Sequence, residues 1–211
     1  MNINDFQEAQ ELPEDLLGYI FDKQRTLMEK YHPIEKANGL LICEDVPVNL
    51  HDAKGQARLK EMAWRCMEEV AEALESHYLL KDPDHTKEEL ADALHFFVEM
   101  CILSDISPKH LLWTTEGDFK RAWEFYSKEK PIKSVAEFVL ELGCTCNCLK
   151  NKPWKQTQML TNIVEYNVHI RRAFYAFIYL CSMYGIKDEV ELFQLYFRKS
   201  QVNEFRQRSN Y

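Results

Sequence analysis

The chain contains little glycine and proline, with six and seven residues respectively among 211. Together with long stretches of helical apolar spacing, this scarcity predicts an all-α protein. No apolar run reaches the roughly eighteen residues of a membrane span, so we expect no membrane partner. The acidic, polar segment 1–12 does not resemble a signal peptide. Seven cysteines, an odd number mostly in helical apolar contexts, suit a reducing compartment, and we expect a cytoplasmic protein.

Acidic residues outnumber basic ones in this chain, and the net charge is −8. A protein of this charge is not expected to bind a nucleic-acid backbone, although metal ions at an acidic site would still admit a nucleotide. The length fits one compact domain with a real core, so residues 1–211 are predicted to form a single all-α domain.

Two acidic motifs stand twenty residues apart in this sequence. Glu69 with Glu72, and Glu89 with Asp92, are each spaced by three residues, which places each pair on one face of a helix. If the two helices pack side by side, four carboxylates converge and repel one another unless cations neutralise them. Oxygen-only sites favour Mg²⁺, with Mn²⁺ as a substitute, and such metal clusters commonly handle phosphates.

The alternative is that both motifs are solvated helix faces, as most acidic motifs are. Apolar residues flank these acids closely, however, so the acids should face a groove between helices, where unpaired charge is costly. His95, three residues after Asp92, is expected to be a packed residue or a hydrogen-bonding neighbour of the site.

The helix boundaries can be predicted from residues that favour the start or the end of a helix. A first helix is expected from Pro13 to Tyr31, stopped by His32 and Pro33. A second is expected over 57–80, and a third begins near Thr86, a candidate N-cap with Glu89 at the capping-box position.

A weak internal repeat, which we call the internal echo, relates residues 62–106 to residues 135–186. It predicts a duplicated helical hairpin, and so a pseudo-symmetric four-helix core with added helices. In the second copy Arg171 and Arg172 stand where the first has carboxylates. The competing interpretation is that any two amphipathic helices look alike.

The C-terminal segment places Lys199, Asn203 and Arg206 on one helical face, with Tyr211 at the end. Lysine and arginine on one face suit polyphosphate oxygens, whereas the alternative is a basic helix end favoured by the helix dipole.

The paired motifs, EEVAE and EELADALHFF, resemble the all-α nucleoside triphosphate pyrophosphatases, which include MazG and the dimeric dUTPases. The tail is similar to the K-N-x-x-N-x-x-R…G-Y pattern of the dimeric dUTPases and the phage dCTP/dUTP pyrophosphatase. Ser200 and Asn210 replace the first asparagine and the glycine. MazG-type proteins lack this tail, so it favours the dUTPase branch, and a phage nucleotide-pool enzyme is one implication.

The resemblance implies a homodimer that hydrolyses dUTP to dUMP and pyrophosphate with two or more Mg²⁺ ions per active site. It implies that Glu69, Glu72, Glu89 and Asp92 bind the metal, with Glu69 also acting on the attacking water. Lys199, Asn203, Arg206 and Tyr211 would hold phosphate or sugar oxygens, and Gln24 would read the base. Two alternatives stay open: a pyrophosphatase for dCTP or another nucleotide, and a non-enzymatic helical regulator on the same scaffold.

Overall fold

The computed structural model describes residues 3–128, 134–152, 154 and 156–209, and within these ranges the chain forms eight α-helices and no strand. This confirms the all-α prediction. The helices are α1 (Leu16–Ala37), α2 (Ala53–Glu75), α3 (Pro83–Leu103), α4 (Pro108–Leu111), α5 (Phe119–Tyr126), α6 (Ser134–Cys148), α7 (Ile163–Met183) and α8 (Glu189–Arg208). A π-helical turn, Ser76–Leu80, continues α2, and short 3₁₀ turns cover Ile3–Asp5 and Trp113–Thr115.

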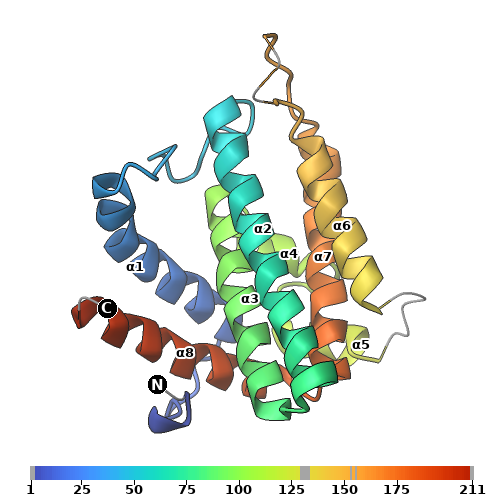
Figure 1. The fold of residues 1–211 in the computed structure, drawn as a ribbon. Coiled ribbons are helices and arrows are strands. Elements are labelled where there is room, and N and C mark those ends of the chain that lie inside the picture. The colour runs from blue at the N-terminus through green and yellow to red at the C-terminus, as the bar shows by residue number, and fades with distance from the viewer. Residues whose placement is uncertain (1–2, 129–133, 153, 155, 210–211) are drawn as a thin grey trace.

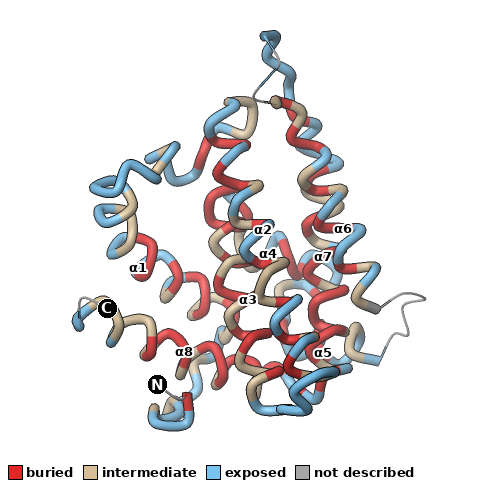
Figure 2. Tube along the Cα trace, viewed as in Figure 1, coloured by how far each residue is buried: buried red, intermediate tan, exposed pale blue. Residues whose placement is uncertain are grey.

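Two antiparallel hairpins, α2–α3 and α6–α7, form the centre of the molecule (Figure 1). Their facing sides are buried, whereas the outward sides are exposed (Figure 2). The ring of Phe97 on α3 stacks on Phe174 and Phe177 of α7, with centroid separations of 5.8 and 6.3 Å. These hairpins are the two that the internal echo predicts, with α4 and α5 between them in the chain.

Helices α1 and α8 form a second layer against α3, on the side away from α6 (Figure 1). Tyr19 of α1 meets Phe193 of α8 edge to face at 5.5 Å. The hydroxyl of Tyr196 donates a hydrogen bond to the carbonyl oxygen of Ile20. Helix α3 is therefore covered by α2 on one side and by α1 and α8 on another, so side chains from these three helices surround it.

The prediction that Pro33 stops the first helix was wrong, because α1 continues to Ala37. Proline removes one hydrogen-bond donor and usually disrupts a helix interior. Here its ring is exposed to solvent, and the buried Leu27 and Met28 hold the preceding turns in the core. Asn38 then caps the helix by donating its backbone N–H to Ile34.

The start of α3 also differs from the prediction. Asp82 is the N-cap, since its side chain accepts the backbone N–H of His85, and Pro83 occupies the first turn. Thr86 lies inside the helix and donates its hydroxyl hydrogen to the Asp82 carbonyl. Glu89 is consequently not needed for a capping box, and its carboxylate is available for other contacts.

No described helix is long and apolar enough to cross a membrane.

Candidate active site

Three carboxylates converge where α2 packs against α3. Glu69 comes from α2, and Glu89 and Asp92 come from one face of α3. Each offers an oxygen atom, and these atoms all lie within 4.8 Å of one another. The small or branched core residues Val70, Ala91 and Ala93, at most 1% exposed, bring the two backbones close enough for this convergence. We call Glu69, Glu89 and Asp92 the acidic cluster.

Burial and mutual repulsion raise the pKa values of all three acids. Burial, then the charge of Asp92 and a hydrogen bond with Glu89, raises the pKa of Glu69 to about 8. Burial raises the pKa of Asp92 to about 6, even though the Lys199 ammonium opposes the shift. Burial likewise raises the pKa of Glu89. Near neutral pH the cluster therefore holds protons that a bound cation would displace.

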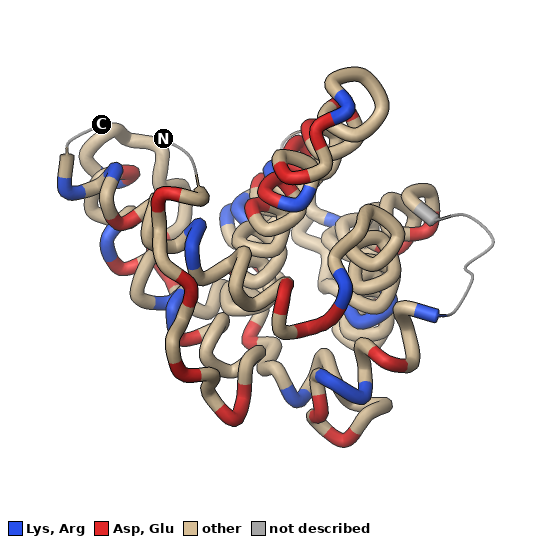
Figure 3. Tube along the Cα trace, turned by 90° about the horizontal axis from the view of Figure 1, so that it is seen from below, with Lys and Arg blue, Asp and Glu red and all other residues tan. Residues whose placement is uncertain are grey.

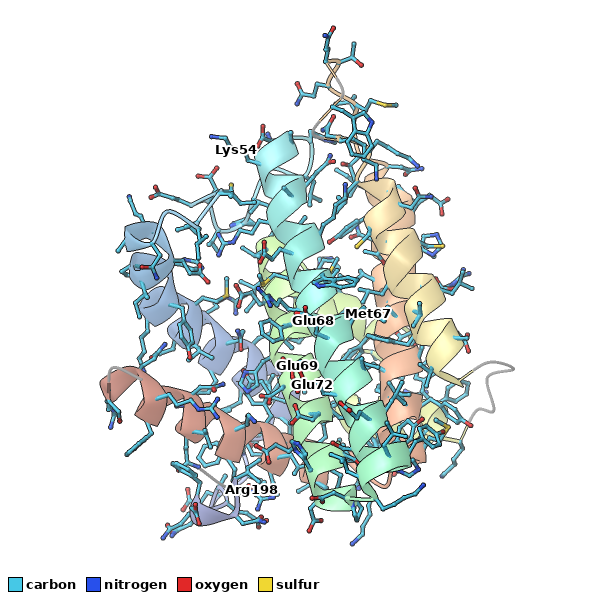
Figure 4. The ribbon with its side chains drawn as sticks, viewed as in Figure 1. Lys54, Met67, Glu68, Glu69, Glu72 and Arg198 are labelled. Atoms are coloured by element: carbon cyan, nitrogen blue, oxygen red, sulfur yellow. The ribbon has the colours of Figure 1, made fainter. Side chains whose placement is uncertain are left out.

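The fourth predicted metal ligand, Glu72, is exposed on α2 one turn after Glu69 and is not among the three converging acids (Figure 4). It is nevertheless close enough for its charge to raise the pKa values of Glu69 and Glu89. Glu68, by contrast, accepts hydrogen bonds from Trp64 at 2.8 Å and Arg65 at 3.0 Å. Glu68 therefore lies outside the group of converging acids.

Lys199 joins α8 to the acidic cluster. Its ammonium lies 2.6 Å from Asp92 Oδ2 and 2.6 Å from Glu88 Oε1. These contacts more than offset burial and raise the lysine pKa above its usual value, so Lys199 is a permanent cation here. Glu88 is thus a direct partner of a predicted phosphate-binding residue.

A cavity of about 300 Å³ opens on one side of the acidic cluster, between α1, α2, α3 and α8. Glu69 and Asp92 stand in its wall, and the rest of the lining mixes carbon-rich and polar side chains, among them Leu27, Tyr31, Met62, Phe96, Asn203 and Arg206. Its volume is at the small end of the usual range for ligand pockets. We call it the mixed cavity.

A second cavity of about 570 Å³ opens on another side of the cluster and is lined mainly by charged groups. Glu89 and Lys199 form part of its wall, with His85 hydrogen-bonded to Glu89 at 3.0 Å. We call it the charged cavity. Arg206 lines both cavities, so one guanidinium group spans the two sides of the acidic cluster. Acidic and basic positions are interspersed over this end of the molecule (Figure 3).

Gln24, the predicted base reader, lies in the wall of the mixed cavity and is only 3% exposed. Its amide Nε2 donates to Glu99 Oε2 at 3.1 Å. Its carbonyl oxygen lies 2.8 Å from His95 Nδ1. It shares the single hydroxyl hydrogen of Tyr196, at an O···O distance of 3.0 Å, with the carbonyl oxygen of Ile20. The network ends at the buried Arg58, which pairs with Glu99 at 3.8 Å.

The structure describes two of the three remaining tail residues that were predicted to bind phosphate. Asn203 and Arg206 lie on α8 at the mixed cavity, as their spacing indicates. Tyr211 lies outside the described residues.

Several cavity residues were not predicted from the sequence. Glu35 is part of the helix only because α1 continues past Pro33, whereas Tyr31 lies within the predicted helix. Their spacing from Gln24, at seven and eleven residues, follows the helical period. It indicated one face for Tyr31, and would have done so for Glu35 had the predicted helix not ended too early. Glu99, two turns after Asp92 on α3, has the same periodic signal.

The second hairpin replaces the acidic cluster with an internal ion pair. The carboxylate of Glu141 on α6 lies 2.6 Å from His169 Nδ1 and 4.0 Å from Arg172 on α7. In the sequence echo, His169 and Arg172 take the places of Glu89 and Asp92. There the acid faces a histidine and an arginine instead of further carboxylates. Among the described residues, the acidic cluster is the only group that qualifies as a metal site.

An oxygen-only carboxylate cluster between a mixed and a charged cavity is a donor set typical of enzymes that use a divalent cation on anionic substrates. The family model described as dUTPase matches residues 60–211, well over half of the chain. The chain therefore belongs to the dUTPase family and is a nucleoside triphosphate diphosphatase. The family generally uses a divalent metal, and the donor set of the cluster fits such an ion. No curated protein and no solved structure matched the chain.

Proposed function

We propose that this protein hydrolyses dUTP to dUMP and pyrophosphate in a Mg²⁺-dependent reaction. The observation that carries the proposal is the position of the acidic cluster, between a mixed cavity suited to a nucleoside and a charged cavity suited to a phosphate chain. The family match supports the reaction type.

Glu69, Glu89 and Asp92 are the residues that would hold Mg²⁺, with Glu72 completing the set from the edge of the site. When bound, the ion would polarise phosphoryl oxygens and lower the pKa of a coordinated water. Glu69 is our candidate for the group that orients the attacking water and accepts its proton.

The phosphate chain is assigned to α8. Lys199, in the wall of the charged cavity, and Arg206, in the walls of both, would neutralise charge that develops on the leaving pyrophosphate. Asn203 would hold a sugar or phosphate oxygen, and Gln24 would contact the base. Tyr211 is proposed from the family resemblance as a further phosphate or sugar contact.

We also propose a homodimer. The stretch around the α6–α7 connection exposes large apolar side chains, with Trp154 77%, Leu160 74% and Val164 72% exposed. Surfaces of this kind are often covered by another chain.

Product analysis on the four deoxynucleoside triphosphates and dUTP tests the proposed function. With Mg²⁺ we expect dUMP and pyrophosphate from dUTP, and no turnover with excess chelator. Preferential hydrolysis of dCTP or a purine nucleotide would be consistent with the proposed reaction but would show that dUTP is not the preferred substrate. No turnover of any nucleotide would overturn the proposal itself.

A thermal unfolding series at pH 6 and pH 8 tests the metal site separately. Because the folded-state pKa values of Glu69 and Asp92 lie above their unfolded values of 4.5 and 3.8, the metal-free folded protein holds extra protons. The stability contribution of these groups is therefore present at low pH and declines as pH rises towards about 8. Mg²⁺ competes with these protons, so its stabilising effect should be larger at pH 8 than at pH 6.

At a concentration about 100-fold above its Kd, Mg²⁺ should stabilise by about 3 kcal/mol, or roughly 5–10 °C in Tm. NaCl at matched ionic strength controls for screening. Equal Mg²⁺ effects at the two pH values, or none at either, would contradict the assignment of the acidic cluster as the metal site.

A further inference from the structure

The second hairpin has a cavity of its own. It measures about 320 Å³, opens between α5, α6 and α7, and is close in volume to the mixed cavity of about 300 Å³. Its lining includes three tyrosines, two glutamates and an arginine, namely Tyr126, Tyr175, Tyr179, Glu137, Glu141 and Arg172. We call it the tyrosine cavity. These residues lie outside the site proposed for dUTP.

The contact between the two hairpins agrees with a pseudo-two-fold relation. The internal echo pairs each residue of α3 with the residue of α7 that lies 80 positions later. One such pair, Phe97 and Phe177, meets directly in the core, with nearly parallel rings at 7° and centroids 6.3 Å apart. A residue that contacts its own counterpart is what a two-fold relation requires. The internal echo is therefore a relation in space as well as in sequence.

The same pairing carries the wall of the mixed cavity onto the wall of the tyrosine cavity. Helix α3 lines the mixed cavity with Asp92, His95, Phe96 and Glu99. Their counterparts on α7 are the residues with which it lines the tyrosine cavity, namely Arg172, Tyr175, Ala176 and Tyr179. Any helix face shows this spacing, but here the two walls also share one register. The tyrosine cavity is therefore the counterpart of the mixed cavity, with different side chains.

The charges beside this wall differ from those of the acidic cluster. Glu141 of α6 lies 2.6 Å from His169 and 4.0 Å from Arg172, which are the counterparts of two acids of the cluster. It thus takes the place of Glu69, but with nitrogen-containing partners. An arginine supplies directly the positive charge that a metal ion supplies in an acidic cluster. An anion bound beside Arg172 therefore needs no metal.

Two tyrosines of the cavity form a fixed aromatic surface. The rings of Tyr126 and Tyr175 stack with centroids 3.8 Å apart and an interplanar angle of 7°. Thr114 holds both, since its hydroxyl donates to Tyr175 at 2.9 Å and lies 2.8 Å from the Tyr126 hydroxyl. The Tyr175 hydroxyl donates in turn to the carbonyl oxygen of Leu111 at 2.7 Å. Planar bases stack on such rings with little selectivity among them.

We propose that the tyrosine cavity binds a nucleoside monophosphate without a metal ion. The base would lie against the tyrosine rings and the phosphate against Arg172, while a sugar hydroxyl would donate to Glu137. One guanidinium group beside two carboxylates does not match the charge of a triphosphate, so the cavity favours the monophosphate. Taking the ligand to be a nucleotide rests on the proposed function, which assigns the counterpart cavity to one.

Calorimetry on the full chain in excess chelator tests this inference. We expect dUMP and dAMP to bind the wild type with Kd values of roughly 0.01–1 mM, because stacking does not select the base. Arg172→Gln should weaken both by about tenfold or more, as expected for a charge-assisted hydrogen bond to phosphate. Arg172→Lys keeps the charge and should lose less. The Arg172 side chain is 61% exposed, so both variants should keep the Tm of the wild type.

Two control variants locate the ligand. Arg171→Gln makes the same change one position earlier, outside the lining of the tyrosine cavity, and Arg206→Gln changes the candidate active site instead. Both should bind dUMP within about twofold of the wild type in chelator. Loss of binding in Arg206→Gln but not in Arg172→Gln would place the ligand in the active site and overturn the inference. Equal losses in Arg171→Gln and Arg172→Gln, or no wild-type binding below about 10 mM, would overturn it as well.

Turnover of dUTP with Mg²⁺ separates this inference from the proposed function. The kcat/KM of Arg172→Gln should stay within about twofold of the wild type, since Arg172 lies outside both cavities beside the acidic cluster. A wild type that hydrolyses dUTP but binds no monophosphate in chelator would overturn this inference alone. Monophosphate binding that depends on Arg172, without turnover of any nucleotide, would overturn the proposed function alone.

Discussion

Glu69→Gln is expected to lower kcat by about three orders of magnitude, because several kcal/mol of transition-state stabilisation depend on the metal site. The substitution keeps the size of the side chain and removes one charge from the three converging acids. It also removes repulsion that raises the pKa values in the cluster, so the metal-free variant should unfold at the same or a higher temperature than the wild type. Loss of activity without loss of stability would therefore separate a functional effect from misfolding.

The neighbouring residue offers a matched control. Glu68→Gln makes the same chemical change one position earlier on α2, at a side chain held by Trp64 and Arg65 outside the cluster (Figure 4). Its kcat should remain within about twofold of the wild type, since isolated surface pairs contribute little. Steady-state rates of pyrophosphate release at saturating Mg²⁺ measure both variants. An active Glu69→Gln enzyme, or equal losses in both variants, would rule out the acidic cluster as the reaction centre.

Arg206→Gln is expected to lower kcat/KM by about a hundredfold, comparable to the loss of one charged donor at a phosphate. Arg206 lines both cavities beside the acidic cluster, so its guanidinium can reach a substrate that passes from one to the other. Because the leaving pyrophosphate gains charge in the transition state, kcat should fall as well as KM rise.

Arg208→Gln is the corresponding control on the same helix. Its side chain is 79% exposed and pairs with Glu204 at 3.7 Å, so kcat/KM should change by less than about twofold. Full kinetics with dUTP at constant ionic strength distinguish the two arginines. If both variants lose activity equally, the effect is general electrostatic attraction, and the specific role of Arg206 is wrong.

The local parts of the fold and site could be predicted from the sequence. Amphipathic spacing predicted the helices, since helical period and apolar burial are properties of short segments. The i, i+3 acids predicted which faces of α2 and α3 carry carboxylates, and three of the four acids do converge. The spacing of Lys199, Asn203 and Arg206 likewise placed them on one face of α8, next to the site.

The errors came from local rules that distant contacts overrode. Pro33 would end an isolated helix, but the buried residues before it keep α1 in place and bring Tyr31 and Glu35 to the cavity. The sequence pattern also placed Glu72 and Glu89 in equivalent roles. In the folded chain Glu89 is buried and Glu72 is exposed.

The sequence by itself determined the all-α class, the acidic faces and the basic face of the last helix, because each depends on spacing within one helix. Only the tertiary structure decided which charges meet, namely Lys199 between Glu88 and Asp92. It alone also brought Gln24 of α1 to Glu99 and His95 of α3. The physical reason is that hydrogen bonds and ion pairs depend on distances of a few ångströms between helices, and those distances are set by core packing across the whole chain.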